Sequence, residues 1–191
     1  LSVFVLGTFI MRAAGCVAND IVDRNIDPFV ERTKSRPLAD GRVRLVEAVL
    51  VFLALSTFAL MLMFTLNEIT RWMAVAGFCI AILYPFMKRV TFFPQVILGI
   101  AFSWGIPMAS TAIHGKLSVP VCLFFLMSVI WIIAYDTQYA MVDRRDDRNI
   151  GVKSTALLLG DWDRLAIGVL QSVSVILLFL LGNYSGFKTP Y

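Results

Sequence analysis

The sequence predicts an all-α integral membrane protein, a bundle of several transmembrane helices. Hydrophobic residues make up 59% of its 191 residues and charged residues only 16%, and the mean hydropathy is +0.79. Soluble domains contain about 25% charged residues, so this composition argues against a soluble globular protein. The apolar residues also fall into long runs, and a helix needs about 20 such residues to cross a bilayer.

Six apolar runs are candidate spans. The third is the shortest, and Tyr84 and Lys88 can extend it, because aromatic rings and lysine side chains are accommodated at the membrane interface. The fourth contains Gly99, Gly105 and Pro107, which a helix in a bilayer tolerates as kinks or points of close packing. The runs cover residues 1–18, 45–66, 72–87, 93–113, 117–140 and 165–181.

The basic residues are distributed unevenly between these spans. Thirteen of the 17 Lys and Arg residues follow the first, third or fifth span. Because cytoplasmic connections carry the excess of positive charge, these three connections are predicted to be cytoplasmic. The same topology explains the net charge of +4 without a nucleic-acid partner. The chain begins at Leu1 within an apolar run, so we expect it to lack an N-terminal part.

The first acidic motif follows the first span at its cytoplasmic end. Asn19, Asp23 and Asp27 are spaced i, i+4 and i+8, so they share one helix face if the helix persists to Pro28. Like charges at this spacing destabilise a helix, and the negative end of the helix dipole adds to the cost. This arrangement favours a bound cation.

A second acidic motif follows the fifth span on the same side of the membrane. Tyr139, Asp143 and Asp147 repeat the spacing, and Asp136 lies one turn deeper. Facing carboxylates suit Mg²⁺, which takes a few protein ligands and completes its coordination with water and substrate phosphates. The alternative is two solvated loops with unrelated acidic residues, but the matched spacing and side favour a metal-dependent diphosphate site.

Basic residues near the two motifs provide the positive charge that a diphosphate needs. Arginine contacts phosphate through two parallel hydrogen bonds, whereas lysine acts as a point charge. Each of these residues has a simpler explanation, since topology alone demands basic connections. They are Arg32, Lys34, Arg36, Lys88, Arg89 and Lys153.

Arg12 lies inside the first apolar run, two turns before Asn19 and on roughly the same helix face. An arginine within the membrane is costly and marks a cavity, a partner or a substrate. One explanation is a structural salt bridge to a neighbouring span. The other is an anchor for a substrate carboxylate, held by paired hydrogen bonds.

These motifs resemble those of the UbiA superfamily of intramembrane aromatic prenyltransferases. Residues 19–27 read NDxxDxxxD, residues 136–147 read DxxYAxxDxxxD, and residues 84–88 read YxxxK. The stretches KSRPL at 34–38 and GVKST at 151–155 extend the resemblance. Members of the superfamily have nine transmembrane helices. The six spans therefore resemble the second to the seventh, and residues 1–191 are expected to form a single transmembrane domain that is truncated at both ends.

The resemblance is to the bacterial branch that acts on 4-hydroxybenzoate, and it implies an activity. A polyprenyl group would pass from polyprenyl diphosphate to the ring carbon ortho to the hydroxyl of 4-hydroxybenzoate, releasing diphosphate, in ubiquinone biosynthesis. The enzyme would lie in the bacterial inner membrane with its site facing the cytoplasm, with the lipid bilayer around it and no obligatory protein partner.

The resemblance also implies roles for particular residues. Mg²⁺ would be the cofactor. The expected metal ligands are Asn19, Asp23, Asp27, Asp143 and Asp147. The expected diphosphate ligands are Asn19, Arg32, Lys34, Arg36, Lys88, Lys153 and Tyr139. Arg12 would bind the aromatic acid, Tyr84 and Tyr139 would face the allylic cation, and the expected catalytic residues are Asp23, Asp143, Lys88 and Arg12.

Two other functions remain open. The first is prenylation of a different acceptor within the same superfamily, such as a menaquinone, tocopherol or haem precursor. Replacing Arg12 with alanine should abolish the use of an aromatic acid as acceptor, so Arg12 distinguishes this alternative from prenylation of 4-hydroxybenzoate. The second is cation transport, which predicts acidic residues deep within several spans on both sides of the midplane. In this sequence the acidic residues collect on one side.

Overall fold

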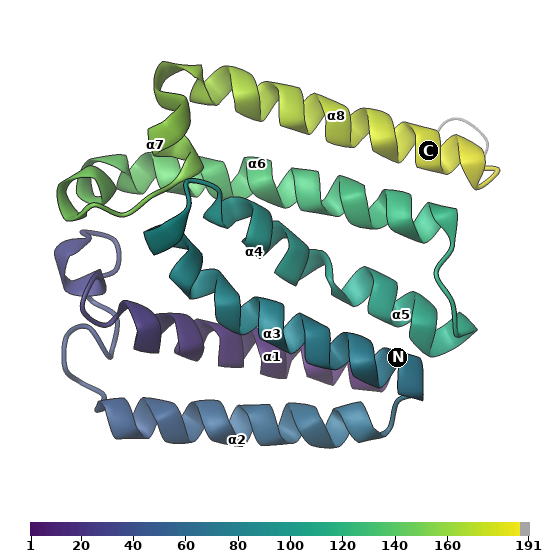
Figure 1. Ribbon diagram of the computed structural model, residues 1–191, viewed down its shortest axis with the longest axis horizontal. Helices are drawn as coiled ribbons and strands as arrows, with labels where there is room; N and C mark the ends of the chain where they lie inside the picture. Colours follow the sequence, from purple (N-terminus) through teal and green to yellow (C-terminus); the bar gives the residue numbers. More distant parts are fainter. Residues whose placement is uncertain (188–191) are drawn as a thin grey trace.

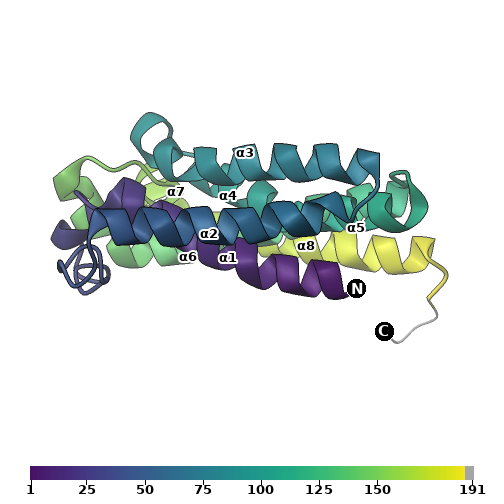
Figure 2. The same ribbon diagram turned by 90° about the horizontal axis from the view of Figure 1, so that it is seen from below.

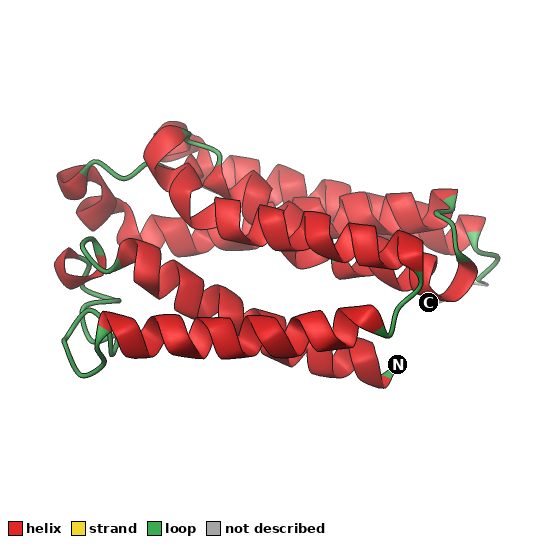
Figure 3. Cartoon of the chain, turned by 60° about the horizontal axis from the view of Figure 1, so that its bottom comes forward, coloured by secondary structure: helices red, strands yellow, loops and turns green. Residues whose placement is uncertain are grey.

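The computed structural model describes residues 1–187, and the regular secondary structure in that part of the chain is helical (Figure 3). Six stretches are long and apolar enough to cross a membrane, so the predicted all-α bundle of six spans is confirmed. Two helices form the fourth span, and the sixth includes a short leading helix. The elements are α1 (Ser2–Asp23), η1 (Asp27–Phe29), α2 (Leu45–Phe64), α3 (Glu68–Val90), α4 (Pro94–Ser103), α5 (Gly105–His114), α6 (Val119–Ile150), α7 (Thr155–Leu159), η2 (Gly160–Trp162) and α8 (Asp163–Tyr184), where η marks a 3-10 turn.

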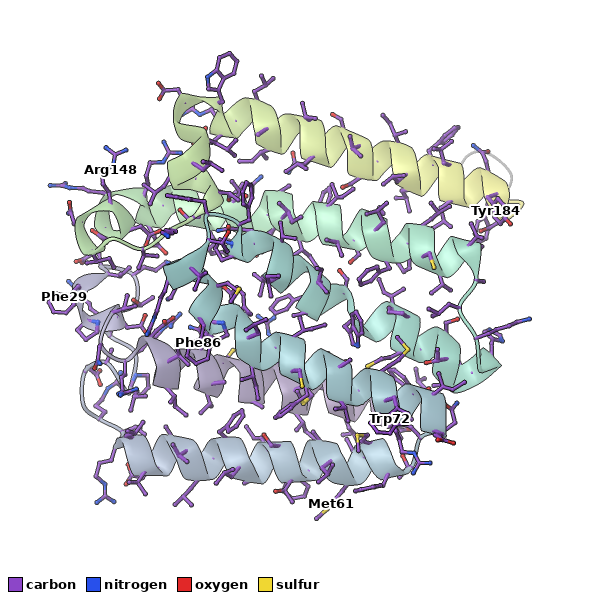
Figure 4. All side chains as sticks on the ribbon, viewed as in Figure 1. Phe29, Met61, Trp72, Phe86, Arg148 and Tyr184 are labelled. Atoms are coloured by element: carbon purple, nitrogen blue, oxygen red, sulfur yellow. The ribbon has the colours of Figure 1, made fainter. Side chains whose placement is uncertain are left out.

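Successive spans run in opposite directions, which places the first, third and fifth connections at one end of the bundle, on the left in Figure 1. Phe29 and Arg148 lie at this end, and Trp72 and Tyr184 lie at the other (Figure 4). Helix α6 packs against α4, α5, α7 and α8, whereas α1 packs against α2 and α3. In Figure 2, α3 lies above α1, α2, α6 and α8. One end of the bundle therefore gathers segments that are far apart in the sequence.

The first acidic motif is not one continuous helix. Helix α1 ends at Asp23, and the backbone N–H of Ile26 donates to the Asp23 carbonyl over 2.7 Å. A new 3-10 turn then begins at Asp27 with Pro28 in its first turn. The helix therefore does not persist to Pro28, which has no N–H to donate and so could not continue the hydrogen bonds of α1.

The second acidic motif is helical throughout. Helix α6 continues well beyond the predicted end of its apolar run at residue 140 and ends at Ile150. Gly151 follows with a φ of 73°, the left-handed conformation in which glycine commonly terminates helices. The unbroken helix keeps Tyr139, Asp143 and Asp147 on one face, as their spacing predicts.

The fourth span bends where its glycines and proline predict a kink. Helix α4 ends at Ser103, α5 begins at Gly105, and the Trp104 side chain donates from Nε1 to the Met73 carbonyl of α3 over 2.8 Å. This contact needs a glycine on α3, because a Cβ added at Gly77 would lie 2.4 Å from the Trp104 ring. The Trp104 contact at the bend thus packs α3 closely against the fourth span.

The outer surface of the bundle is strongly apolar. Phe9 and Ile113 are 73% and 76% exposed, and Met61 projects outward from α2 (Figure 4). Buried positions such as Ala134 and Ser174 hold small side chains, which allow helices in a membrane to approach closely. This distribution, with six apolar spans, is that of a multi-pass membrane protein.

Candidate functional site

A cavity of about 150 Å³ lies at the end of the bundle where the first, third and fifth connections meet. It is lined by the ends of α1, α3 and α6, the start of α4, and the connections that follow α1 and α6. The cavity brings together all of the predicted site residues except Arg12 and Lys34. Those that line it are Asn19, Asp23, Asp27, Arg32, Arg36, Tyr84, Lys88, Tyr139, Asp143, Asp147 and Lys153.

Asp23 and Lys88 form an ion pair at the wall of this cavity. The ammonium of Lys88, near the end of α3, donates to Oδ2 of Asp23. Asp23 is only 1% exposed, and its other carboxylate oxygen, Oδ1, is buried without a hydrogen-bond partner. A buried carboxylate oxygen with no partner carries a desolvation cost that a bound cation would relieve.

Arg36 holds two carboxylates of the first motif. Its Nη1 donates to Oδ2 of Asp27 over 3.0 Å and to Oδ1 of Asp20 over 2.9 Å. The hydroxyl of Thr33 also donates to the Asp27 carbonyl over 3.1 Å, which ties the connection after α1 back onto η1. Asp27 therefore reaches the cavity through a turn and an ion pair rather than through a continued helix.

Arg32 joins the two acidic motifs. It donates from Nε and Nη2 to the Asp143 carboxylate at distances of 2.5 to 3.1 Å, the paired geometry that arginine adopts with carboxylates. The hydrogen bonds that Asp143 accepts raise the pKa of Arg32 above its usual value, more than burial lowers it, so Arg32 stays charged. Its guanidinium also lies 6.0 Å from the ring centre of Tyr139.

Asp136, Asp147 and Asn19 also line the cavity, and their side chains have no hydrogen-bond or ion-pair partner among residues 1–187. No group of three or more His, Cys, Asp or Glu in this part of the chain is close enough to enclose a metal ion by itself. Mg²⁺ needs only one or two carboxylates when substrate phosphates complete its shell. The oxygen donors, including the unpartnered Oδ1 of Asp23, therefore fit a metal bound together with a phosphate ligand.

Lys153 enters the cavity from the connection after α6. Its backbone N–H donates to the Lys88 carbonyl over 2.9 Å, and its ammonium donates to the Val90 carbonyl over 3.0 Å. The ammonium also lies 5.6 Å from the ring centre of Phe92. The end of α3 and the connection after α6 are thus joined where two basic residues of the cavity lie.

Lys34 and Arg12 lie outside this cavity. Lys34 is exposed and pairs with Glu31 at 2.6 Å, as a solvated residue of the connection. Arg12 lies deeper on α1, with its guanidinium 5.6 Å from the ring centre of Phe102 on α4. The predicted alternative of a structural salt bridge finds no support, since Arg12 has no ion pair in the part of the chain that the structure describes.

Asp136 and Gln95 line the cavity but are not among the predicted site residues. Asp136 was visible as the first position of the second motif, and the structure places it on the cavity wall. Gln95 gave no signal in the sequence, because a single neutral amide belongs to no charge or spacing pattern. It lines the cavity from the start of α4 and is almost fully buried.

Comparison with known proteins agrees with this geometry. The family described as the UbiA prenyltransferase family matches residues 1–191. A protein of Vibrio parahaemolyticus named 4-hydroxybenzoate octaprenyltransferase is 53% identical over 184 residues, which is 96% of this chain and 65% of that protein. The chain thus spans just under two thirds of the length of this relative.

Solved structures show the same fold. The apo structure of a UbiA homolog from Aeropyrum pernix K1 matches with a TM-score of 0.86 and 27% identity, over 98% of this chain and 71% of that one. The structure of a UbiA homolog from Archaeoglobus fulgidus bound to GPP and Mg²⁺ matches with a TM-score of 0.75 and 19% identity, over 95% of this chain and 66% of that one.

Proposed function

Because this chain belongs to the UbiA prenyltransferase family, we propose that it carries the catalytic site of an enzyme that prenylates 4-hydroxybenzoate in ubiquinone biosynthesis. The polyprenyl group would come from a polyprenyl diphosphate and would be attached ortho to the hydroxyl. The observation that carries the proposal is one cavity in which the two acidic motifs meet four basic residues, Arg32, Arg36, Lys88 and Lys153. The name of the 53% identical relative supports the choice of acceptor.

The ion pairs of the cavity suggest how a metal diphosphate is received. Asp23 pairs with Lys88, Asp27 with Arg36, and Asp143 with Arg32. With a metal diphosphate bound, these pairs would exchange partners: the carboxylates would hold the metal and the basic side chains would hold the phosphates. Each carboxylate and each basic side chain would then still have an oppositely charged partner.

The residues that would hold Mg²⁺ are the predicted ligands Asn19, Asp23, Asp27, Asp143 and Asp147. When bound, the metal supplies Lewis-acid stabilisation of the charge that develops on the leaving diphosphate.

Lys88, Arg32, Arg36 and Lys153 stabilise the same charge electrostatically, which lowers the barrier to ionisation of the allylic carbon–oxygen bond. The rings of Tyr84 and Tyr139 face the cation that forms and exclude water from it.

Arg12 is proposed to hold the carboxylate of the acceptor. It lies on the helix that carries the first acidic motif, about two turns deeper than Asn19, and next to the Phe102 ring. A guanidinium binds a carboxylate through paired hydrogen bonds, which would fix the direction of the aromatic ring. The electron-rich ring carbon then attacks the cation without a covalent enzyme intermediate.

The setting of the enzyme is part of the proposal. Positive residues at the end that holds the cavity indicate that this end is cytoplasmic, and the bacterial relatives indicate the inner membrane. The acidic residues of the spans lie at the cavity end apart from Glu68, which begins α3 at the other end. This one-sided placement does not support the alternative of a cation transporter.

The test supplies membranes that contain the full-length protein with a long polyprenyl diphosphate, radiolabelled 4-hydroxybenzoate and Mg²⁺. EDTA and D143A membranes serve as parallel controls. We expect label in a lipid-soluble product only when metal and Asp143 are both present. Metal-dependent release of diphosphate without labelled product would mean that the acceptor is a compound other than 4-hydroxybenzoate. If neither diphosphate release nor labelled product is detected, prenyl transfer is refuted.

A further inference from the structure

Gln95 is a buried polar residue for which the proposed chemistry has no role. It is the second residue of α4, it is 3% exposed, and it lines the cavity. Buried amide groups in proteins usually have all of their hydrogen-bonding atoms satisfied, because an unpaired buried group costs free energy. An incompletely satisfied amide at a cavity wall therefore suggests a ligand.

One hydrogen bond determines the orientation of the Gln95 amide. Its Oε1 accepts from the backbone N–H of Thr155 over 3.2 Å. A backbone N–H can only donate, so the oxygen must occupy this position and the NH₂ group the other. Within residues 1–187, Nε2 has no acceptor. Two N–H donors are therefore held in a defined orientation without a protein partner.

The start of α4 has the polarity that suits an anion. Pro94 and Gln95, its first two residues, both line the cavity, so the positive end of this helix dipole faces it. The backbone N–H of Gln95 also has no carbonyl acceptor among the described residues. Helix N-termini with free N–H groups bind phosphates readily.

We propose that Gln95 is a further diphosphate-binding residue, which donates from Nε2 to a phosphate oxygen of the prenyl diphosphate. This inference rests on the function proposed above. Gln95 differs from Lys88, Arg32 and Arg36, because each of those side chains pairs with a carboxylate. The amide is neutral and needs no exchange of partners, so it can contact the diphosphate before the ion pairs open.

The test measures binding of geranyl thiolodiphosphate, a substrate analogue that resists ionisation, to full-length protein in lipid nanodiscs with Mg²⁺. The variant Q95E keeps an oxygen for the Thr155 N–H and replaces the donor with a second oxygen. We expect its dissociation constant to rise at least tenfold. The variant Q95M removes both polar atoms and should weaken binding to a similar extent.

T137V is the matched structural control. The Thr137 hydroxyl shares a buried hydrogen bond of 2.7 Å with the Thr155 hydroxyl, and neither residue lines the cavity. T137V should lower the melting temperature and leave the dissociation constant within twofold of wild type. If Gln95 has only a structural role, the dissociation constant should rise as the melting temperature falls in all three variants, Q95E, Q95M and T137V. That result would overturn the inference.

The two proposals fail in different ways. If wild-type protein does not bind the analogue, the proposed function is wrong. If wild-type protein binds the analogue and both Gln95 variants have dissociation constants within twofold of the wild-type value, only the inference about Gln95 is wrong.

A second measurement uses wild-type protein labelled with ¹⁵N-glutamine and needs no substitution. Inorganic diphosphate with Mg²⁺ should shift a glutamine side-chain amide signal, and an unchanged spectrum contradicts the inference.

Discussion

The backbone N–H of Lys153 donates to the backbone carbonyl of Lys88 over 2.9 Å. This main-chain contact holds two basic residues together at the cavity, although Lys88 lies near the end of α3 and Lys153 lies in the connection after α6. It uses neither ammonium group, so both side chains stay free to change partners. The main chain therefore brings these two basic residues together, and a side-chain substitution at Lys153 should leave this contact in place.

K153A tests this separation of backbone and side chain. The variant keeps the main-chain contact to Lys88 and removes the side chain beyond Cβ, including the ammonium group and its contacts with Val90 and Phe92. We expect the KM for polyprenyl diphosphate to rise about tenfold to a hundredfold, the effect of losing one hydrogen bond from a charged group, about 1.5–3 kcal/mol. Steady-state kinetics check it. K34A is the matched control, because Lys34 lies outside the cavity, and its KM should change less than twofold.

R12A tests the proposed acceptor site. Losing the guanidinium should raise the KM for 4-hydroxybenzoate by about a hundredfold, since a bidentate charged contact disappears. Binding of the diphosphate substrate should not change, because Arg12 lies outside the cavity. R24A is the control on the same stretch of chain, since Arg24 is exposed and donates to the Ile21 carbonyl. Normal turnover of 4-hydroxybenzoate by R12A would contradict the role of Arg12.

R32Q tests the exchange of ion pairs. With Arg32 removed, Asp143 loses its charged partner and becomes a better ligand for a free cation. Electron paramagnetic resonance with Mn²⁺ as the metal probe should show about tenfold tighter metal binding without diphosphate, while diphosphate binding weakens by a similar factor. R42Q removes an arginine that pairs with Asp40 outside the cavity, and it should alter neither. Parallel changes in both affinities would argue against the exchange.

G77A tests the packing at the bend of the fourth span. The added methyl group would lie 2.4 Å from the Trp104 ring, so the ring must move and lose its bond to Met73. Overpacking of this kind typically costs about 1–3 kcal/mol, and the melting temperature should fall by several degrees. G168A places a methyl group where no atom lies within 4 Å, and this variant should melt at or above the wild-type temperature.

The sequence predicts the spans and most of the cavity wall because both depend on local spacing. On α6 the spacing of Tyr139, Asp143 and Asp147 is sufficient, since one helix carries them all. Asp27 is predicted to lie at the site, and it does, but a turn and Arg36 place it there. Local spacing cannot predict the pairing of Arg32 with Asp143 or of Gln95 with Thr155, because each joins segments that only the folded bundle brings together.

The positions of the ion pairs along the chain have a consequence for biogenesis. Asp23 and Lys88 belong to α1 and α3, so their pair can form once α3 has entered the membrane. The ion pair between Arg32 and Asp143 can form only later, because Asp143 is synthesised 111 residues after Arg32. During insertion, the Asp23 carboxylate can therefore be paired early, whereas Arg32 lacks its Asp143 partner until α6 has been synthesised.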